Sequence, residues 1–529
     1  MRATRRSTLL VTAGVLVSVA ALGLAGQPAS ATAPAAGGAS AHTAGTGTAS
    51  TARQVNVASL PLVATPAPAA SLQGAQRRGA PALPSRPSGK GRPAITGQPS
   101  QAGGPNSTGR GPLVAPAVIA NFPGINQASG CGGCQPPDVN AAVGTTQIVE
   151  TVNLRLQVFN KTGGTLCSFN LNSFLGTSDS LSDPRVQYDN VNGRFSFSIT
   201  VVPASGSAVP AIWVAASTSS NACAGWFVYR VTFSGGSYPP GTLLDYPILG
   251  QDRNALLLAT DNFTPTSENF TVFGIPKSAV YSGAGFSFSA FNTASLVAPA
   301  SNGGIPMIST TFSYFLGAVP GTGYRLYRLT NSGGPGATLT LQATISSTFS
   351  APTRRVNQPG NAQTLDPLDG RIVWSPVNDG NFIWFAHGID LAGFPTVRYG
   401  AISIANNTPF VAVAYRSGTS DDFNPSVSVG NNPGGGNFIC VNWAYTDAPA
   451  GVATSDTVDC VLPGGGVPNL IGTGTVLVNG ASTGEFRFGD YSSATIDPTN
   501  ANGSCAVVAQ QYFASGGSWA TRIARVGTC

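Results

Sequence analysis

A short motif recurs along this chain, and its spacing limits the folds that the chain can adopt. The clearest copy spans residues 488–498, and weaker copies upstream place Pro or Asp beside a short apolar stretch. The weaker copies span residues 136–144, 183–189, 246–252, 305–309, 368–374 and 424–430. Successive copies begin about 46 to 65 residues apart, as one supersecondary unit with variable loops would require. A unit of short strands cannot bury both of its faces alone, so the copies must stack on one another.

Seven copies predict an all-β fold, a seven-bladed β-propeller. The two ends of the domain test whether the ring closes. About 39 residues from Asp490 to Cys529 and about 25 from Leu113 to Asp138 together make one repeat. We therefore expect the last blade to combine three C-terminal strands with one N-terminal strand over residues 113–121. A ring closed in this way leaves only short, protected strand edges.

The apolar runs of the domain are short and alternate with polar residues, which is typical of strands. Examples are residues 147–152, 194–199, 382–386 and 438–443. Charged residues make up only 9% of the chain, and no segment carries an apolar stripe at helical spacing. We expect essentially no helix after the N-terminal segment.

The N-terminus has the pattern of a secretion signal. Arg2, Arg5 and Arg6 precede an apolar run over residues 9–24, and Ala-Ser-Ala at 29–31 is a small-residue cleavage site. The pattern predicts a signal peptide over residues 1–31 and a secreted protein, either extracellular or associated with the cell wall. The Arg5-Arg6 pair leaves a twin-arginine route open, although Thr8 favours the general route. No later segment approaches about 18 unbroken apolar residues, so no membrane span is expected after cleavage.

Residues 32–112 are rich in Ala, Pro, Gly, Ser and Thr, and this composition predicts a disordered basic linker before a propeller domain over residues 113–529. The chain before Asp138 carries +10 and no acidic residue, against a total of +6, which leaves −4 for the domain. A nucleic-acid partner is not expected, because the basic residues do not lie on a folded face. Two interpretations of the linker stay open: a flexible spacer, or a tether to an anionic cell-wall polymer.

The eight cysteines all lie in the exported domain, where an even number favours disulfides. The expected neighbours are Cys440 with Cys460 on adjacent strands, Cys505 with Cys529 at the chain end, Cys167 with Cys223, and Cys131 with Cys134. The Cys-Gly-Gly-Cys spacing at 131–134 also suits redox or metal chemistry. No second Cys pair or His cluster accompanies it, so a small loop disulfide is favoured.

Several stretches, taken in order, resemble a large group of exported bacterial propellers placed loosely with the sialidase-like superfamily. They are residues 121–125, 136–138, 143–144 and 152–153, then 423–426, and finally 488–491, 497–498 and 519–523. The resemblance covers the chain from about Asn121 onward. It implies a secreted seven-bladed propeller in a group whose members mostly have no established activity, and so it implies fold more than function.

In a propeller the first strand of each blade lines the axial channel, and the recurring motifs begin these strands. Seven residues are therefore expected to converge at one channel mouth: Asp138, Arg185, Asp252, Asp369, Arg371, Asp490 and Tyr491. One interpretation is structural, with the Asp side chains bonding backbone N–H groups of the turns. The other is a polar mouth that binds a glycan or a cation.

The residues available for catalysis are few. A sialidase needs three arginines, a Tyr nucleophile and a Glu partner. Arg185, Arg371 and Arg487 are candidate arginines, but the domain contains only three glutamates and lacks the Ser-x-Asp-x-Gly-x-Thr-Trp box. Other glycoside hydrolases need two carboxylates at a defined separation, which the sequence alone does not measure.

Lyase or serine chemistry would depend on His387, the single histidine of the domain, at the end of an apolar strand. Such a histidine is more often a hydrogen-bonded structural residue. The lack of histidines argues against zinc, and the segment from Asp497 to Gly503 fits an Asx turn better than a calcium loop.

We therefore expect a monomeric, non-catalytic binding or adhesion module for an extracellular glycan, with no cofactor and no metal. The alternative is an extracellular carbohydrate-active enzyme, a glycoside hydrolase or polysaccharide lyase, with its site at the channel mouth.

Overall fold

The computed structural model describes residues 42–60, 91–92, 115–302, 312–432, 436–461, 467–485, 487–500 and 503–529. All of them belong to one compact unit, Gly38–Cys529. The expected signal peptide, the motif copy at 305–309 and most of the expected linker lie outside the described residues. No helix in the described part of the chain is long and apolar enough to cross a membrane.

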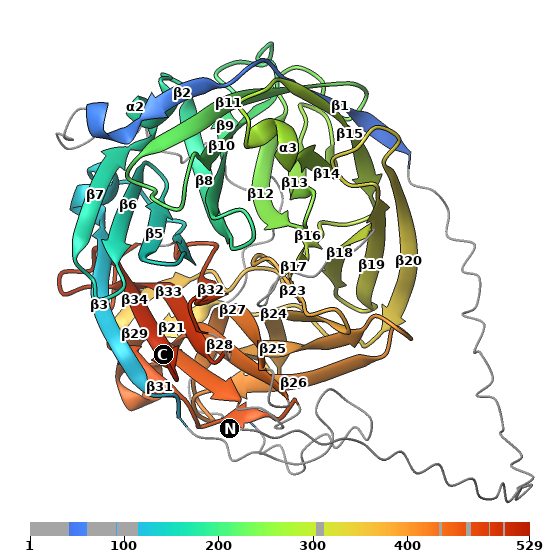
Figure 1. Ribbon diagram of the computed structural model, residues 1–529. Helices are drawn as coiled ribbons and strands as arrows, with labels where there is room; N and C mark the ends of the chain where they lie inside the picture. Colours follow the sequence, from blue (N-terminus) through green and yellow to red (C-terminus); the bar gives the residue numbers. More distant parts are fainter. Residues whose placement is uncertain are drawn as a thin grey trace, which may run out of the picture. The chain divides into compact units, whose positions relative to one another are not determined.

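Antiparallel sheets, built mostly from strands that follow one another in sequence, dominate the described residues (Figure 1). The sheets begin with β4 (Asn140–Val143), β5 (Gln147–Val152), β6 (Arg155–Asn160) and β7 (Thr165–Asn170); then β8 (Ser180–Asp189), β9 (Arg194–Val202), β10 (Ala211–Ser217) and β11 (Gly225–Ser234). Next come β12 (Leu243–Gln251), β13 (Ala255–Phe263), β14 (Glu268–Pro276) and β15 (Phe286–Thr293); then β16 (Ala298–Pro299), β18 (Phe312–Val319), β19 (Gly323–Thr330) and β20 (Thr338–Ser346).

The later sheets follow the same plan. One holds β23 (Val377–Asn378), β24 (Phe382–Leu391), β25 (Phe394–Ser403) and β26 (Pro409–Tyr415), flanked by β17 (Ser301–Asn302) and β30 (Leu470–Ile471). The others hold β27 (Asp421–Asn432), β28 (Gly436–Asp447), β29 (Val452–Val461) and β31 (Thr475–Val478); and β32 (Ser493–Ile496), β33 (Cys505–Phe513), β34 (Trp519–Gly527) and β3 (Val118–Asn126). A small hairpin pairs β21 (Val356–Gln358) with β22 (Asn361–Leu365).

Helices in the described residues are few and short, close to the expectation of essentially none. The α-helices are α1 (Gln127–Cys131), α2 (Leu171–Leu175) and α3 (Lys277–Val280), and two 3-10 turns span Val57–Ser59 and Ala448–Ala450. Side chains of Asn126 and Asn170 cap the first two helices by accepting backbone N–H bonds.

The first strands of the sheets contact one another around a closed circuit. β4 contacts β8, β8 contacts β12, and β12 contacts β16 and β17, which is followed by β23. Both β23 and β24 then contact β27, β27 contacts β32, and β32 returns to β4. Figure 1 shows the sheets standing around the centre of this circuit, with later strands farther out. This architecture is a β-propeller.

Large apolar side chains fill the space between facing sheets. Trp384 on β24 and Trp443 on β28 are both fully buried in one core cluster. Their indole N–H groups are satisfied, by Asp379 at 2.7 Å and by Asp422 at 2.9 Å. Because the core is divided among such interfaces, each sheet is stabilised by its neighbours rather than by itself.

The ends of the domain meet in one sheet. β3 pairs antiparallel with β34, so an N-terminal strand completes the sheet of β32 and β33, as the repeat arithmetic predicts. The strand begins at Val118, and residues 113–114 of the expected range lie outside the described residues. All four predicted disulfides are confirmed; they join Cys131 to Cys134, Cys167 to Cys223, Cys440 to Cys460, and Cys505 to Cys529.

Part of the expected linker is folded, which corrects the prediction of disorder over residues 32–112. Strand β1 (Thr43–Ala49) pairs with both β11 and β15, and β2 (Arg53–Asn56) pairs with β11. Farther along, Arg92 is buried and forms an ion pair with Asp422 at 3.2 Å. The prediction from composition was wrong here because a strand that pairs with a sheet edge uses its backbone groups and needs no large apolar side chains.

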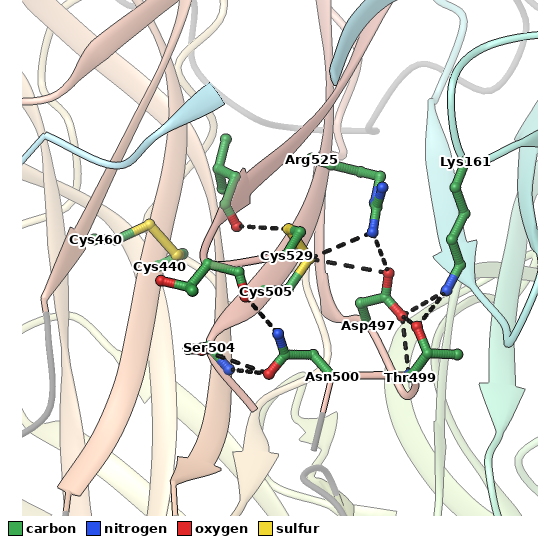
Figure 2. The surroundings of a disulfide bond; sticks show 12 residues. Lys161, Cys440, Cys460, Asp497, Thr499, Asn500, Ser504, Cys505, Arg525 and Cys529 are labelled. Atoms are coloured by element: carbon green, nitrogen blue, oxygen red, sulfur yellow. Dashed lines mark hydrogen bonds and ion pairs between the residues drawn. A yellow bond between two sulfur atoms is a disulfide. The ribbon is translucent and has the colours of Figure 1, made fainter. Parts of the chain in front are cut away.

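Asp497 links the closing sheet to the first one (Figure 2). Its buried carboxylate lies 2.6 Å from Lys161 Nζ, on the β6–β7 turn, and 3.1 Å from Arg525 Nη2, on β34. It also accepts the backbone N–H of Thr499 at 3.0 Å, as an Asx turn does. Burial by itself would raise the pKa of Asp497, but the bonds from Lys161 and Thr499 lower it below its ordinary value. Two cations hold this carboxylate, so the Asx-turn interpretation is preferred to calcium.

We expect Asp497→Asn to lower the free energy of unfolding by about 3 kcal/mol at neutral pH, because two half-buried cations lose their partner. Because the pKa is lowered in the folded state, this contribution exists above the ordinary pKa of 3.8 and disappears as the pH falls below it. Urea unfolding at pH 7 and at successively lower pH measures the difference from wild type, which should shrink below about pH 4.

The control is Asp179→Asn, since the Asp179–Arg230 pair is partly exposed and should contribute less than about 1 kcal/mol. An equal loss in both variants at neutral pH would contradict the role given to Asp497.

Candidate functional site

Polar side chains gather where the first strands of several sheets begin, and we call this set the mouth cluster. It comprises Asp138, Asp183, Arg185, Asp245, Tyr246, Asp261, Asp369, Arg371, Arg487, Asp490 and Tyr491. Six of the seven residues predicted from the sequence therefore come together. They do so although they lie up to about 350 residues apart, because a closed ring brings the starts of its first strands to one end of the axis.

A repeated backbone feature builds this end of the ring. Asp183, Tyr246 and Asn424 have φ of 63°, 48° and 51°, and each is followed by a proline at which the strand ladder is interrupted by a bulge. Asp138 and Leu368 have φ of 54° and 65° in their own motif copies. Proline lacks the N–H that a ladder needs, and a left-handed residue bends the strand. Such conformations cost about 1 kcal/mol or more each in non-glycine residues and often mark functional sites.

One half of the mouth cluster is a group of carboxyls held mainly by hydroxyl, amide and backbone hydrogen bonds, with the charge of Arg487 nearby. Asp183 accepts a bond from the Tyr491 hydroxyl and is hydrogen-bonded to Asp245, on the neighbouring sheet. Asp138 accepts the Asn153 amide at 2.7 Å and the Asp490 backbone N–H at 3.0 Å. Two carboxyls that share a hydrogen bond must share a proton, so this group keeps part of its protons at neutral pH.

The other half is built from ion pairs. Arg371 binds both oxygens of Asp369 and reaches Asp261 at 3.0 Å. Its guanidinium also stacks 4.8 Å above the Tyr246 ring, and the Tyr246 hydroxyl donates to Asp490 at 2.7 Å. Arg487 pairs with the same Asp490 oxygen at 3.1 Å. These ion pairs reach solvent, since the side chains of Asp369, Arg487 and Asp490 are 43%, 30% and 14% exposed.

Arg185 differs from the other two arginines. It is 2% exposed and its guanidinium lies 3.3 Å above the Tyr491 ring. Its Nε and Nη2 have no hydrogen-bond partner among the described side chains. Arg185 thus packs against the face of the Tyr491 ring, while the Tyr491 hydroxyl donates a hydrogen bond to Asp183.

The electrostatics of the mouth cluster favour protonated carboxyls. Burial, together with the charges of Asp183 and Asp490, raises the pKa of Asp138 to about 7. Burial also raises the pKa of Asp261 to about 7, with Glu268 adding to the effect and Arg371 opposing it. The pKa of Asp245 rises well above its ordinary value because of burial and three neighbouring carboxyls. Weak acids of this kind suit proton transfer near neutral pH.

Asp252 does not join the mouth cluster. Its carboxylate accepts the backbone N–H groups of Asn254 and Ala255, both at 2.6 Å, and the hydroxyls of Ser313 and Ser332. This is the structural role that the turn interpretation describes. Asp252 comes at the end of the first strand and not at its start, which is why it lies apart.

Four residues of the mouth cluster were not predicted from the sequence: Asp183, Asp245, Tyr246 and Asp261. Asp183 and Tyr246 stand directly before the proline of their motif copies, so a signal for them was present. Asp261 lies on the second strand of its sheet, directly opposite Asp245 in the β12–β13 ladder. No local pattern marks it, because only strand pairing brings it to the mouth.

A cavity occupies the opposite ends of the same first strands. It is open to solvent and has a volume of about 100 Å³. Its lining comes from residues about four positions after the mouth residues, including Ala142, Gln187, Gln251, Ser428 and Thr495. Four strand residues span about 13 Å, so this cavity is distinct from the mouth cluster. None of the described residues that line it is charged; they supply amides, hydroxyls, the Trp374 side chain and several aliphatic side chains.

His387 lies in the core and not at a site. It is 1% exposed, between Tyr324 Oη at 3.1 Å and the Gly388 carbonyl at 3.0 Å, and it packs on the Phe349 ring. Burial, with the charge of Arg398, lowers the pKa of His387 to about 3. A neutral imidazole enclosed in this way cannot act as the base of a lyase, so the lyase alternative that depends on it is removed.

The described residues contain no group of three or more His, Cys, Asp or Glu side chains placed to hold a metal ion. The Cys131–Cys134 pair is a disulfide.

Comparisons with known proteins give weak likenesses only. No protein-family model and no curated protein matches the chain. The α-L-arabinanase of Penicillium chrysogenum, solved with arabinobiose, has a TM-score of 0.34 and 13% identity over 65% of this chain and 92% of that chain. The exo-β-1,3-galactanase of Phanerochaete chrysosporium has a TM-score of 0.29 and 10% identity over 79% of this chain and 99% of that chain. A GH43 endo-arabinanase from Bacillus licheniformis has a TM-score of 0.22 and 14% identity over 53% and 93%.

A TM-score below 0.5 does not establish a shared fold. The fold and the site are therefore described from this chain's own strands and side chains alone.

We expect at least two aspartate carboxyls of the wild-type protein to titrate near pH 7, those of Asp138 and Asp261. Because their pKa is raised in the folded state, their favourable contribution to folding is complete below about pH 4 and is lost as the pH rises through 7. Carboxyl ¹³C NMR between pH 3 and 9 measures this, and Asp138→Asn should remove one of the two transitions. Titration of every aspartate below pH 5 would contradict the geometry of the cluster.

His387 provides an independent test of burial. Its ring should stay neutral from pH 8 down to about 4, because the pKa is lowered to about 3. Acidification from about pH 6.5 then favours unfolding, since only the unfolded chain takes up that proton. Proton NMR of the two histidine rings gives the result, with the exposed His42 as the second signal. A His387 titration between pH 6 and 7 would show that the ring reaches water.

Proposed function

We propose that this protein is an extracellular glycan hydrolase whose site is the mouth cluster. The observation that carries the proposal is the presence of two kinds of carboxyl in the mouth cluster, where the side chains of Asp369, Arg487 and Asp490 reach solvent. Burial and neighbouring carboxyls raise the pKa of Asp245, and its hydrogen bond with Asp183 favours the protonated form, whereas Asp490 is held by Arg487 and the Tyr246 hydroxyl. Hydrolysis of a glycosidic bond requires one carboxylic acid and one carboxylate on either side of the bond.

The roles follow from these surroundings. Asp245 donates its proton to the glycosidic oxygen as the C–O bond breaks, and Asp183 stabilises Asp245 through their hydrogen bond. Asp490 accepts a proton from the water that attacks the sugar carbon. Asp369, Arg371 and Arg487 lie at the exposed rim and are placed to bind sugar hydroxyls. Buried Arg185 and Tyr491 keep the carboxyl pair in position.

A second candidate function is non-catalytic glycan binding or adhesion, and the cavity at the far end of the first strands favours it. Its described lining combines amides, hydroxyls and the Trp374 side chain with aliphatic side chains and includes no charged residue. Aromatic faces and neutral polar groups of this kind suit a neutral sugar. The two functions use different ends of the ring, so experiments can separate them.

The wider setting belongs to the same proposal. We count the ring as seven blades, taking the ten-stranded sheet as two, because β8 and β12 each begin their own set of four strands. This count, with the motifs described above, supports membership in the exported, loosely sialidase-like propellers. The four disulfides suit a secreted protein at or near the cell wall, and we further propose that it is a monomer. An anionic cell-wall polymer remains a partner for the basic N-terminal region.

The test is product formation by the purified secreted protein on arabinan, galactan, xylan and pectin, measured as new reducing ends. We expect Asp245→Asn and Asp490→Asn each to lower kcat by about 10²- to 10⁴-fold with little change in binding. Asp390→Asn, at the β24–β25 turn, is the matched control and should retain activity. If the wild-type protein binds one of these glycans but forms no product from any of the four, the hydrolase proposal is overturned and the second candidate is favoured.

A further inference from the structure

The N-terminal segment is tied to the ring at two separate places. The first consists of β1 and β2, which lie along the outer strands of two sheets (Figure 1). The second is Arg92, which contacts two further sheets. We call the described residues 43–56 and Arg92 the strap.

β1 fills the gap between the outer edges of two neighbouring sheets. It pairs with β11 through Thr46–Thr48 and with β15 from Thr43 to Ala49, and so turns two sheets into one of ten strands. Its small residues make this fit possible. Ala44 and Gly47 are the buried positions, and any Cβ on Gly47 would overlap the Phe288 ring. The outer edges of two sheets are thereby paired and protected.

Arg92 joins the β25 strand to the start of β27. Its guanidinium donates to the Pro395 carbonyl at 2.8 Å and to Asp422 at 3.2 Å. It lies 4.3 Å from the centre of the Tyr415 ring and 4.9 Å from that of Phe394. The side chains of Arg92 and Asp422 are 1% and 0% exposed. Such a pair breaks only at a large cost, because either partner alone would be a buried, uncompensated charge.

We propose that the strap is a retained part of the secreted protein and acts as an external clamp on the ring. The two sheets that β1 joins carry Asp183 and Asp245, so the clamp fixes the junction across which these carboxyls meet. Residues 32–112 therefore do not form a single free linker, because residues 43–56 and Arg92 are bound to the ring. This inference is independent of hydrolase activity, because it concerns only how neighbouring sheets are held together.

The test uses the full secreted chain and hydrogen–deuterium exchange. Gly47→Val should displace β1 and raise amide exchange in β11 and β15 by about tenfold or more, because both edges lose a hydrogen-bonded neighbour. Thr43→Val, which places the same side chain at an exposed position of β1, is the matched control and should leave exchange unchanged. Arg92→Met should raise exchange in β25 and at the start of β27, and Arg253→Met, at an exposed arginine, should not.

The clamp would be overturned by wild-type exchange in β11 and β15 of Gly47→Val together with wild-type exchange in β25 and at the start of β27 of Arg92→Met. Global unfolding of Gly47→Val, while Thr43→Val stays folded, would support the clamp. A β1 strand with no clamping role could detach without unfolding the ring. All readouts are structural, so failure of the hydrolase proposal and failure of this one are distinguishable.

Discussion

The structure depends on the pairing of β3 with β34, through which the two ends of the domain share one sheet. Without that pairing β34 would present an open edge, and the last sheet would lose its hydrogen-bonded link to the N-terminal part of the domain. The closing sheet is secured again by the Cys505–Cys529 disulfide and by Asp497, which binds Lys161 of the first sheet and Arg525 of its own sheet. Ring closure also determines where the chemistry lies, since only a closed circuit brings the starts of β4, β8, β12 and β32 together.

The mouth cluster shows how a ring can keep many carboxyls close together. Three of them form ion pairs with arginines at the solvent edge, whereas the inner group is held by amide, hydroxyl and shared-proton bonds. An ionised group of that density would be too costly at low dielectric, so protonation relieves it. Protonation of the inner carboxyls stabilises the cluster, and it also places a weak acid next to a charged carboxylate. The packing of the ring is thereby linked to the proposed hydrolysis.

Predictions from the sequence succeeded where the signal is local. The disulfide between Cys440 and Cys460 could be inferred because both lie on what had to be adjacent strands, and His387 could be read as structural from its apolar surroundings. They failed where the deciding contact is long-range. Asp261 reaches the mouth through its ladder partner Asp245, and Asp252 stays away because it ends a strand that it was expected to begin. β1 has a composition typical of disorder, yet edge pairing makes it a strand.

The sequence by itself determined the all-β class, the repeated unit, the paired cysteines and the need for the ends to meet, because spacing and alternation are properties of neighbouring residues. The tertiary structure decided which polar residues share a mouth, which carboxyls keep their protons and where the N-terminal segment binds. The physical reason is that burial, charge pairing and strand edges depend on groups from different sheets, and their meeting is set only when the ring closes.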